Sequence, residues 1–190
     1  GSPGAHIMEV MFAEQGAAVY TLGVGALFVE RLARCLEARE VEYVIDIRSP
    51  PYSFHRPELF PEQLEAFLGA RETRYLSLAA DLGDRPRDVS LLGANGQIDY
   101  RRYRARPGAS RGLERIMRAW QMGCRVCVLG RHPDPVQSHR ARLVGHALFE
   151  RGVQVRHLVT MGDRLMTHEE LLRLVWRVRQ SIHQAHQSSA

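Results

Sequence analysis

The sequence contains no lysine; all 26 of its basic residues are arginine. This absence excludes a lysine Schiff base and the phosphate-binding loop that ends in Gly-Lys-Ser or Gly-Lys-Thr. Arginine favours bidentate contacts with phosphate or carboxylate groups, and the formal net charge of +5 is consistent with an anionic partner. A GC-rich genome, which encodes arginine in place of lysine, is the alternative explanation of this composition.

Cysteine is scarce as well, with three residues in the chain: Cys35, Cys124 and Cys127. Such a small, odd number suits a reducing compartment, and we expect a cytoplasmic protein. Cys124 and Cys127 have Cys-x-x-Cys spacing, but they lie in "GCRVCVLG", which is typical of a strand. Residues three apart on a strand face opposite sides. We therefore predict that the pair binds no metal and that Cys127 is a core residue.

Long hydrophobic runs are also missing. No apolar run approaches the ~20 residues of a membrane-spanning helix, and no signal-peptide pattern opens the chain, so we expect no membrane association. Residues 1–8 are typical of a remnant left by cloning, and residues 184–190 of a disordered tail. Because we find neither an internal repeat nor a linker, we expect residues 9–183 to form one domain.

What is present is an alternation of short apolar strands with amphipathic helices. The last helix starts with Thr167 and Glu170 in the spacing of a capping box. Residues 79–107 form a long irregular stretch, of the kind that is usually functional or disordered. The predicted strands cover residues 19–25, 42–48, 74–78, 125–130 and 153–159, and the predicted helices cover residues 26–39, 61–71, 112–122, 134–151 and 167–182.

This alternation predicts a single-domain α/β fold, a three-layer sandwich with helices on both faces of a five-stranded, mostly parallel sheet. Right-handed crossovers favour the strand order 3-2-1-4-5. The switch point lies between the first and fourth strands, and ligands of such sheets lie there, beyond the carboxyl ends of the strands. The loops at this place are residues 23–25, 46–56 and 130–137.

One motif stands out near these loops: Ser138-His139-Arg140 follows Asp134-Pro135, a strong helix-start signal. The free N–H groups and partial positive charge of a helix start bind anions, here with Ser138 and a nearby arginine as further contacts. In the alternative interpretation, Ser138 caps the helix and Arg140 is a surface charge.

Asp46 and Arg48 alternate at the end of the second strand, so both side chains lie on one face. They form either a buried structural pair or a polar pair that orients a ligand. Arg48 is the most plausible second clamp on an anion, because its strand ends beside the same crevice.

We therefore predict an anion-binding crevice for a phosphate-bearing or nucleic-acid-related ligand. Whether it belongs to an enzyme or to a non-catalytic binding protein stays open, and the sequence does not indicate an oligomeric state. The candidate catalytic residues are Asp46, Ser138 and His139. The predicted ligand-binding residues are Gly23, Gly25, Asp46, Arg48, Gly130, Ser138, His139 and Arg140.

The stretch "DYRRYRARPGASRG" is a second candidate site, for nucleic acid. Aromatic rings stack on bases, and guanidinium groups neutralise phosphates. The alternative is a solvated, mobile loop. The candidate contacts are Tyr100, Arg101, Arg102, Tyr103 and Arg104.

Histidine is frequent enough to raise the question of a metal. His139 and His146 are about two helical turns apart, which is too far for one ion, and no Asp/Glu–His motif accompanies them. We predict no metal and no cofactor.

Four stretches of the chain, "YTLGVG", "YVIDIRSPPYSFHRPELF", "RYLSLAADLGDRP" and "DPVQSHRARLVGHALFERGVQVRHL", resemble a bacterial and archaeal family catalogued as domain of unknown function 488. The best markers are the Asp-x-Arg end of the second strand, the Leu-Gly-x-Arg-Pro turn and the Asp-Pro-x-x-Cys-His-Arg helix start. The resemblance covers residues 19–159 and implies a fold and a site rather than a reaction.

The chain departs from that pattern at the predicted crevice. Ser138 and Gly130 stand where the family commonly has cysteine, and Gly23-Val24-Gly25 stands where it often has Gly-His-Ser. A thiolate at a helix N-terminus is activated by the helix dipole, whereas a serine there needs a separate base. If the family acts through those cysteines, the site of this member is altered or inactive.

Overall fold

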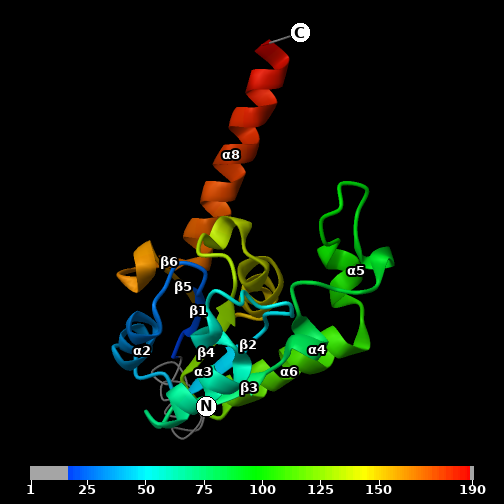
Figure 1. The fold of residues 1–190 in the computed structure, drawn as a ribbon. Helices are drawn as coiled ribbons and strands as arrows, with labels where there is room; N and C mark the ends of the chain where they lie inside the picture. Colours follow the sequence, from blue (N-terminus) through cyan, green and yellow to red (C-terminus); the bar gives the residue numbers. More distant parts are fainter. Residues whose placement is uncertain (1–16, 189–190) are drawn as a thin grey trace, which may run out of the picture.

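The computed structural model describes residues 17–188 and shows an α/β fold around a mixed six-stranded sheet (Figure 1). The expected cloning remnant, residues 1–8, lies outside the described residues. The strands are β1 (Val19–Gly23), β2 (Tyr43–Asp46), β3 (Arg74–Ser77), β4 (Val126–Gly130), β5 (Val155–Val159) and β6 (Arg164–Thr167).

The strands run in the order β3-β2-β4-β1-β5-β6. The expected parallel pairing of β1 with β4 is present, with Gly23 opposite Gly130. The predicted order 3-2-1-4-5 is wrong, because β4 lies between β2 and β1. The right-handed crossover rule sets the face on which a connection runs, but not how many strands it passes. All five residues of β4 are buried, and a strand buried on both faces favours the middle of a sheet.

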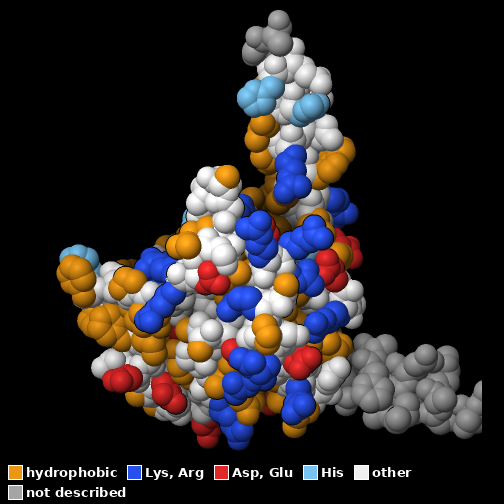
Figure 2. Space-filling model, turned by 90° about the vertical axis from the view of Figure 1, so that its right-hand side faces the viewer, with side chains coloured by type: hydrophobic (Ala, Val, Ile, Leu, Met, Phe, Trp, Pro, Cys, Tyr) orange, Lys and Arg blue, Asp and Glu red, His pale blue; other side chains and the backbone are white. Residues whose placement is uncertain are grey.

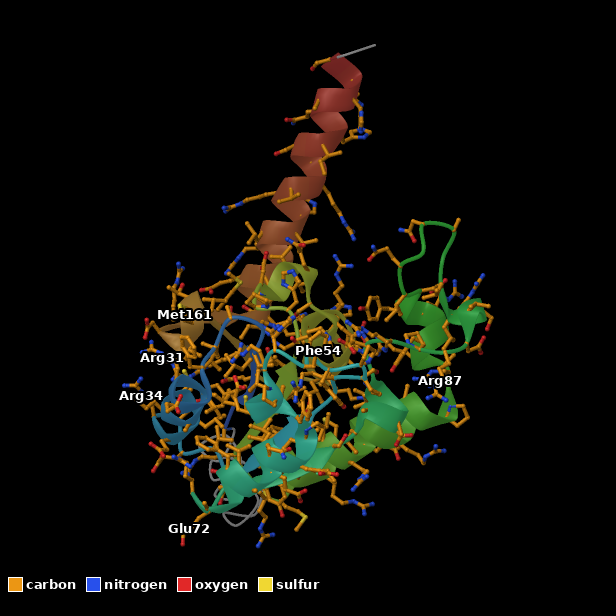
Figure 3. The ribbon with its side chains drawn as sticks, viewed as in Figure 1. Arg31, Arg34, Phe54, Glu72, Arg87 and Met161 are labelled. Atoms are coloured by element: carbon orange, nitrogen blue, oxygen red, sulfur yellow. The ribbon has the colours of Figure 1, made fainter. Side chains whose placement is uncertain are left out.

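A sixth strand, which the sequence analysis missed, makes the sheet mixed. β6 pairs antiparallel with β5 at the edge, and its four residues are half-buried or exposed, too short and too polar to stand out as a strand. Thr160 and Met161 turn the chain between the two strands, both with positive φ. Arg31 donates from Nε to the carbonyl oxygen of Met161 at 3.1 Å, and the two residues lie near each other in Figure 3.

Helices cover both faces of the sheet, each over its own hydrophobic cluster. One cluster joins the sheet to α2 and α3, and the other joins it to α4, α6 and the helical segment after β4. The predicted layers are therefore present. The helices are α2 (Val29–Glu37), α3 (Pro61–Gly69), α4 (Ala79–Leu82), α5 (Tyr100–Arg104), α6 (Pro107–Gln121), α7 (His146–Glu150) and α8 (His168–Ser188).

Residues 79–107 are more regular than expected. They contain α4, a 3₁₀ turn at Val89–Leu91, an antiparallel bridge between Leu92 and Ile98, and α5. Asp99 caps α5 by accepting hydrogen bonds from two backbone N–H groups. The Arg-Tyr stretch thus begins as a capped helix rather than as a mobile loop, and this helix stands beside the main body in Figure 1.

The single helix expected over residues 134–151 is broken into three pieces. Asp134 caps the start as predicted, accepting from the N–H of Val136 at 2.9 Å. A 3₁₀ turn over Pro135–Gln137 follows, then a π-helix over Arg140–Gly145, then α7. Ser138 between the first two has extended dihedral angles. Short π-helical segments are rare and frequently lie at functional sites.

The chain ends in α8, which projects away from the body in Figure 1. Its capping box is present: the N–H of Glu170 bonds to Oγ1 of Thr167, and Oε2 of Glu170 to the N–H of Thr167, both at 3.1 Å. Residues 184–188, expected in a disordered tail, are helical instead. No helix among residues 17–188 is long and apolar enough to cross a membrane.

Candidate anion-binding crevice

A crevice of about 420 Å³ opens at the carboxyl ends of β2 and β4, whereas the sequence analysis expected the ligand between the first and fourth strands. Its walls come from the loop before α5, from α5 and from the segment that follows β4. Arginine dominates its charged side chains. The lining residues are Ile47, Asp84, Arg85, Pro86, Leu92, Gly96, Gln97, Ile98, Tyr100, Gly130, Arg131, His132, Gln137, His139, Arg140 and Arg142.

The predicted glycines let the chain itself pack closely at this edge. A Cβ on Gly23 would overlap the backbone carbonyl of His132, and one on Gly25 would lie 2.8 Å from the carbonyl oxygen of Arg131. Gly130 lines the crevice, and a Cβ there would lie 3.0 Å from Cδ of Arg140. Gly23 and Gly25 therefore bring the segment after β4 over the end of β1, where it forms a wall of the crevice.

Arg140 is fully buried and is one of the residues that line the crevice. Nε donates to Oγ1 of Thr21 at 3.0 Å, and the terminal nitrogens donate to the carbonyl oxygens of His132 and Pro133. No carboxylate among the described residues forms an ion pair with it. Burial lowers the pKa of Arg140 to about 10, so the group is still a cation at neutral pH. The Asp134 carboxylate interacts with this cation without forming an ion pair, so burial of the charge is compensated only in part, and a bound anion would offset more of that penalty.

Arg48, the other buried arginine of this edge, has a carboxylate partner. Its Nε and Nη2 donate to the two oxygens of Asp46 at 3.0 and 2.8 Å, and Nη2 also donates to the carbonyl oxygen of Leu59. Tyr75 donates its hydroxyl to Asp46 at 2.6 Å, and burial and the nearby carboxylate raise the pKa of Tyr75. This geometry matches the structural alternative for the pair. Arg48 lines a separate small cavity of about 80 Å³.

Ser138 is buried and acts within its own turn. Its hydroxyl donates to the carbonyl oxygen of Pro135 at 3.1 Å and accepts from the N–H of Ala141 at 3.3 Å. This is the capping role that the sequence analysis set against anion binding.

His139 is held at both ring nitrogens. Nε2 lies 2.7 Å from the carbonyl oxygen of Leu82 and Nδ1 lies 3.0 Å from the Tyr100 hydroxyl. A carbonyl oxygen only accepts, so Nε2 carries the proton and the Tyr100 hydroxyl donates to Nδ1. Burial lowers the pKa of His139 and raises that of Tyr100 to about 12, so both groups are neutral at pH 7.

Three further arginines complete the lining, and the sequence analysis proposed none of them for this site. Arg131 pairs with Asp84 at 3.0 Å. Burial opposes ionisation of Asp84, but hydrogen bonds from Arg131 and from the N–H of Ser49 outweigh it and hold the pKa of Asp84 below its usual value. Arg85 and Arg142 are exposed and form no ion pair within the described chain. Arg131 could have been identified from the sequence, because it directly follows Gly130 at the end of a predicted strand.

Behind Arg140, the hydroxyl of Thr21 begins a chain of imidazoles. Its Oγ1 lies 2.7 Å from Nδ1 of His157. His157 then contacts His168 at 3.0 Å, His168 contacts His146 at 3.3 Å, and His146 meets Glu150 at 3.1 Å.

The direction of this chain is set at both ends. Arg140 donates to Thr21, so the hydroxyl is free to donate its own proton inward to His157. The carboxylate of Glu150 only accepts. Neutral His157 and His168 therefore each carry their proton on Nε2 and donate it to the next imidazole outward. Burial lowers the pKa of His157 to about 3 and that of His168 to about 4.

The residues of the nucleic-acid candidate lie beside the crevice but do not form one surface. Tyr103 is buried, with its hydroxyl donating to the carbonyl oxygen of Gly83 at 2.7 Å, so its ring is not available to stack on a base. Arg104 pairs with Glu150 at 2.7 Å, and Arg102 pairs with Asp99 at 3.4 Å. Tyr100 lines the crevice. Figure 2 shows basic side chains scattered over this face and up onto α8.

The comparisons with known proteins give a family. A family model described as "Domain of unknown function DUF488" matches residues 28–147, well over half of the chain. The chain belongs to this family. No curated protein and no solved structure matches it significantly.

Gly130 and Ser138, which stand where the family commonly has cysteine, are placed differently at the crevice. Gly130 lines the crevice, so a cysteine there would lie beside the Arg140 side chain. Ser138 is buried behind the wall, 1% exposed, and is not among the lining residues. Both positions are buried, but they are unequal, because a thiol at residue 130 would lie against the Arg140 side chain at the crevice and a thiol at residue 138 would lie in the turn behind its wall.

Proposed function

We propose that the crevice binds a phosphate-bearing small molecule, and that the protein acts as an anion-binding protein derived from an enzyme. Arg140 carries this proposal, because it is a buried cation at the crevice without a carboxylate partner. Arg85 and Arg142 add exposed guanidinium groups to the same lining, and guanidinium groups bind phosphate bidentately. A volume of about 420 Å³ lies in the range of small-molecule sites.

Binding without turnover is favoured over catalysis by the state of the three catalytic candidates. The Asp46 carboxylate is paired with Arg48, the Ser138 hydroxyl caps its own turn, and both nitrogens of His139 are hydrogen-bonded. A nucleophile and a general base must instead reach one another and the substrate.

The test of binding compares Arg142→Gln with Arg87→Gln, which removes the same charge from an exposed arginine outside the crevice (labelled in Figure 3). Calorimetric titration with inorganic phosphate, sulfate and nucleotides should show ten- to a hundredfold weaker affinity for Arg142→Gln, since a charge-assisted contact contributes about 1.5–3 kcal/mol. The control should bind like the parent. Equal affinities in the two variants, or an unmodified protein that binds none of these anions, would reject the proposal.

The enzymatic alternative is tested by restoring cysteine. In a Cys124→Ser background, which removes the half-buried native thiol, Gly130→Cys should react with a soluble disulfide reagent faster than Ser138→Cys, because residue 130 is buried but lines the crevice. Ser138→Cys should react more slowly, because the position is buried and is not among the residues that line the crevice. Hydrolysis of a phosphate ester that appears with Gly130→Cys would favour the enzyme over the binding protein.

A further inference from the structure

Helix α8 leaves the body of the molecule after its first turns. Among its 21 residues, His168 and Leu171 are buried, and every residue from Trp176 to Ser188 is exposed. Packing of an apolar face supplies most of the stability of a helix in a protein, so a partner packed on the exposed half of α8 would stabilise it. Figure 2 shows apolar side chains exposed along α8, next to its arginines.

Four apolar residues of α8 form a stripe that starts at the buried Leu171 and continues through Val175, Val178 and Ile182, whereas the exposed Leu172, Leu174 and Trp176 lie off it. Steps of four, three and four residues keep them on one side of the helix, in the spacing of a coiled-coil seam. The sequence of steps, four, three and four, reads the same from either end of the stripe. Two antiparallel copies therefore place Leu171 level with Ile182 of the second copy, and Val175 level with Val178, which is the self-complementarity that two-fold symmetry demands.

A groove of about 540 Å³ runs between the first half of this stripe and the body. Pro135, Val136 and Ala141 form its apolar floor, and Arg142 and Arg179 are its charged residues. We propose that the groove holds the C-terminal half of α8 from a second copy of this chain, packed antiparallel, so that the protein is a two-fold symmetric dimer.

Charge selects the antiparallel arrangement. Residues 180–188, "QSIHQAHQS", contain neither arginine nor acid, and a helix C-terminus carries partial negative charge. This segment therefore enters a groove that contains Arg142 and Arg179 without bringing arginines together. A parallel pair would instead align Arg173, Arg177 and Arg179 with their own counterparts, and it would place both bodies at the same end.

The groove and the anion-binding crevice share two lining residues, Tyr100 and Arg142. A helix from the second copy would thus lie against one wall of the crevice. The dimer itself does not depend on what the crevice binds.

Sedimentation and light scattering of the full chain at several concentrations test the proposal. We expect a mass of twice 21.6 kDa. Val178→Glu, on the stripe, should raise the dimer dissociation constant at least ~100-fold, because a charge would be buried in the seam. Trp176→Glu puts the same charge on an exposed apolar residue about 200° around the helix and should stay dimeric. A monomeric unmodified protein, or equal weakening by both variants, would overturn the proposal.

Cysteine cross-linking tests the antiparallel register, again in the Cys124→Ser background. Leu171→Cys with Ile182→Cys should give a covalent dimer on oxidation, because each thiol meets the other position of the second copy. Within one copy, eleven residues of helix separate the two thiols by about 16 Å, too far for a bond. Ile182→Cys by itself should give none. Efficient cross-linking by this single variant would show a parallel pair, and a dimer that the double variant fails to cross-link would refute the register.

Discussion

Nε2 of His157 and Nδ1 of His168 lie 3.0 Å apart in the interior, behind the buried guanidinium of Arg140. Both imidazoles are neutral in the folded protein, because burial lowers their pKa values to about 3 and about 4. Burial lowers the pKa of His139 as well. In the unfolded chain a histidine titrates near pH 6.5.

Stability should therefore fall as the pH drops below about 6.5. Below that pH the unfolded chain binds protons that the folded histidines do not, so the free energy of unfolding decreases by at most about 1.4 kcal/mol per pH unit for each of them. Urea unfolding between pH 7 and pH 5 measures this slope. His168→Asn should flatten it, whereas His183→Asn, on the exposed part of α8, should not. A free energy of unfolding that is constant over this range would contradict the buried neutral chain.

The two buried arginines should respond differently to removal. Arg48→Met leaves the buried Asp46 carboxylate without its ion-pair partner, which should destabilise the protein by about 3–5 kcal/mol. Arg140→Met strands no carboxylate and should cost less, while abolishing phosphate binding. Urea unfolding of the two variants gives the comparison. A larger loss for Arg140→Met would show that Arg140 serves the fold rather than a ligand.

Phosphate should raise the free energy of unfolding of the unmodified protein, but not that of the Arg140→Met variant. At a phosphate concentration ten times the dissociation constant, binding to the folded state adds about 1.4 kcal/mol. Thermal unfolding with and without phosphate measures this increment, and potassium chloride of equal ionic strength is the control. The same rise in Tm in both proteins would indicate a general salt effect.

Gly23 should not tolerate a methyl group. Gly23→Ala would overlap the backbone carbonyl of His132, and overpacking of this kind costs at least about 1–3 kcal/mol. Gly69→Ala is the matched control, since its Cβ would meet nothing within 4 Å, and it should be neutral or stabilising by up to about 1 kcal/mol. Equal Tm values for the two variants would show that the segment after β4 moves aside easily.

Nucleic acid is the alternative anion, and its binding would depend steeply on salt. Each phosphate contact that Arg101, Arg102 or Arg104 makes should contribute nearly one unit to the slope of log affinity against log salt. Replacing all three by alanine should flatten that slope by up to about three units. Filter binding of single- and double-stranded oligonucleotides over a salt series gives the slope. Because Tyr103 is buried, we expect little preference for single strands.

Much of the fold followed from local patterns in the amino-acid sequence. Apolar runs that end in glycine or in Asp46 and Arg48 indicated parallel strands, and the carboxyl ends of parallel strands meet at one edge. Capping chemistry also acts within a few residues, so Asp134 and the pair of Thr167 and Glu170 could be identified as helix starts.

Other features were decided by contacts between residues far apart in the chain. The place of β4 between β1 and β2 depends on which strand is buried on both faces. Whether a buried arginine has a counterion depends on what folds against it: Arg48 has a carboxylate two residues away, whereas Arg140 contacts Thr21, 119 positions distant. The imidazoles that follow Thr21 come from three separate elements. No local pattern encodes such neighbours, because burial and charge compensation are properties of the packed chain.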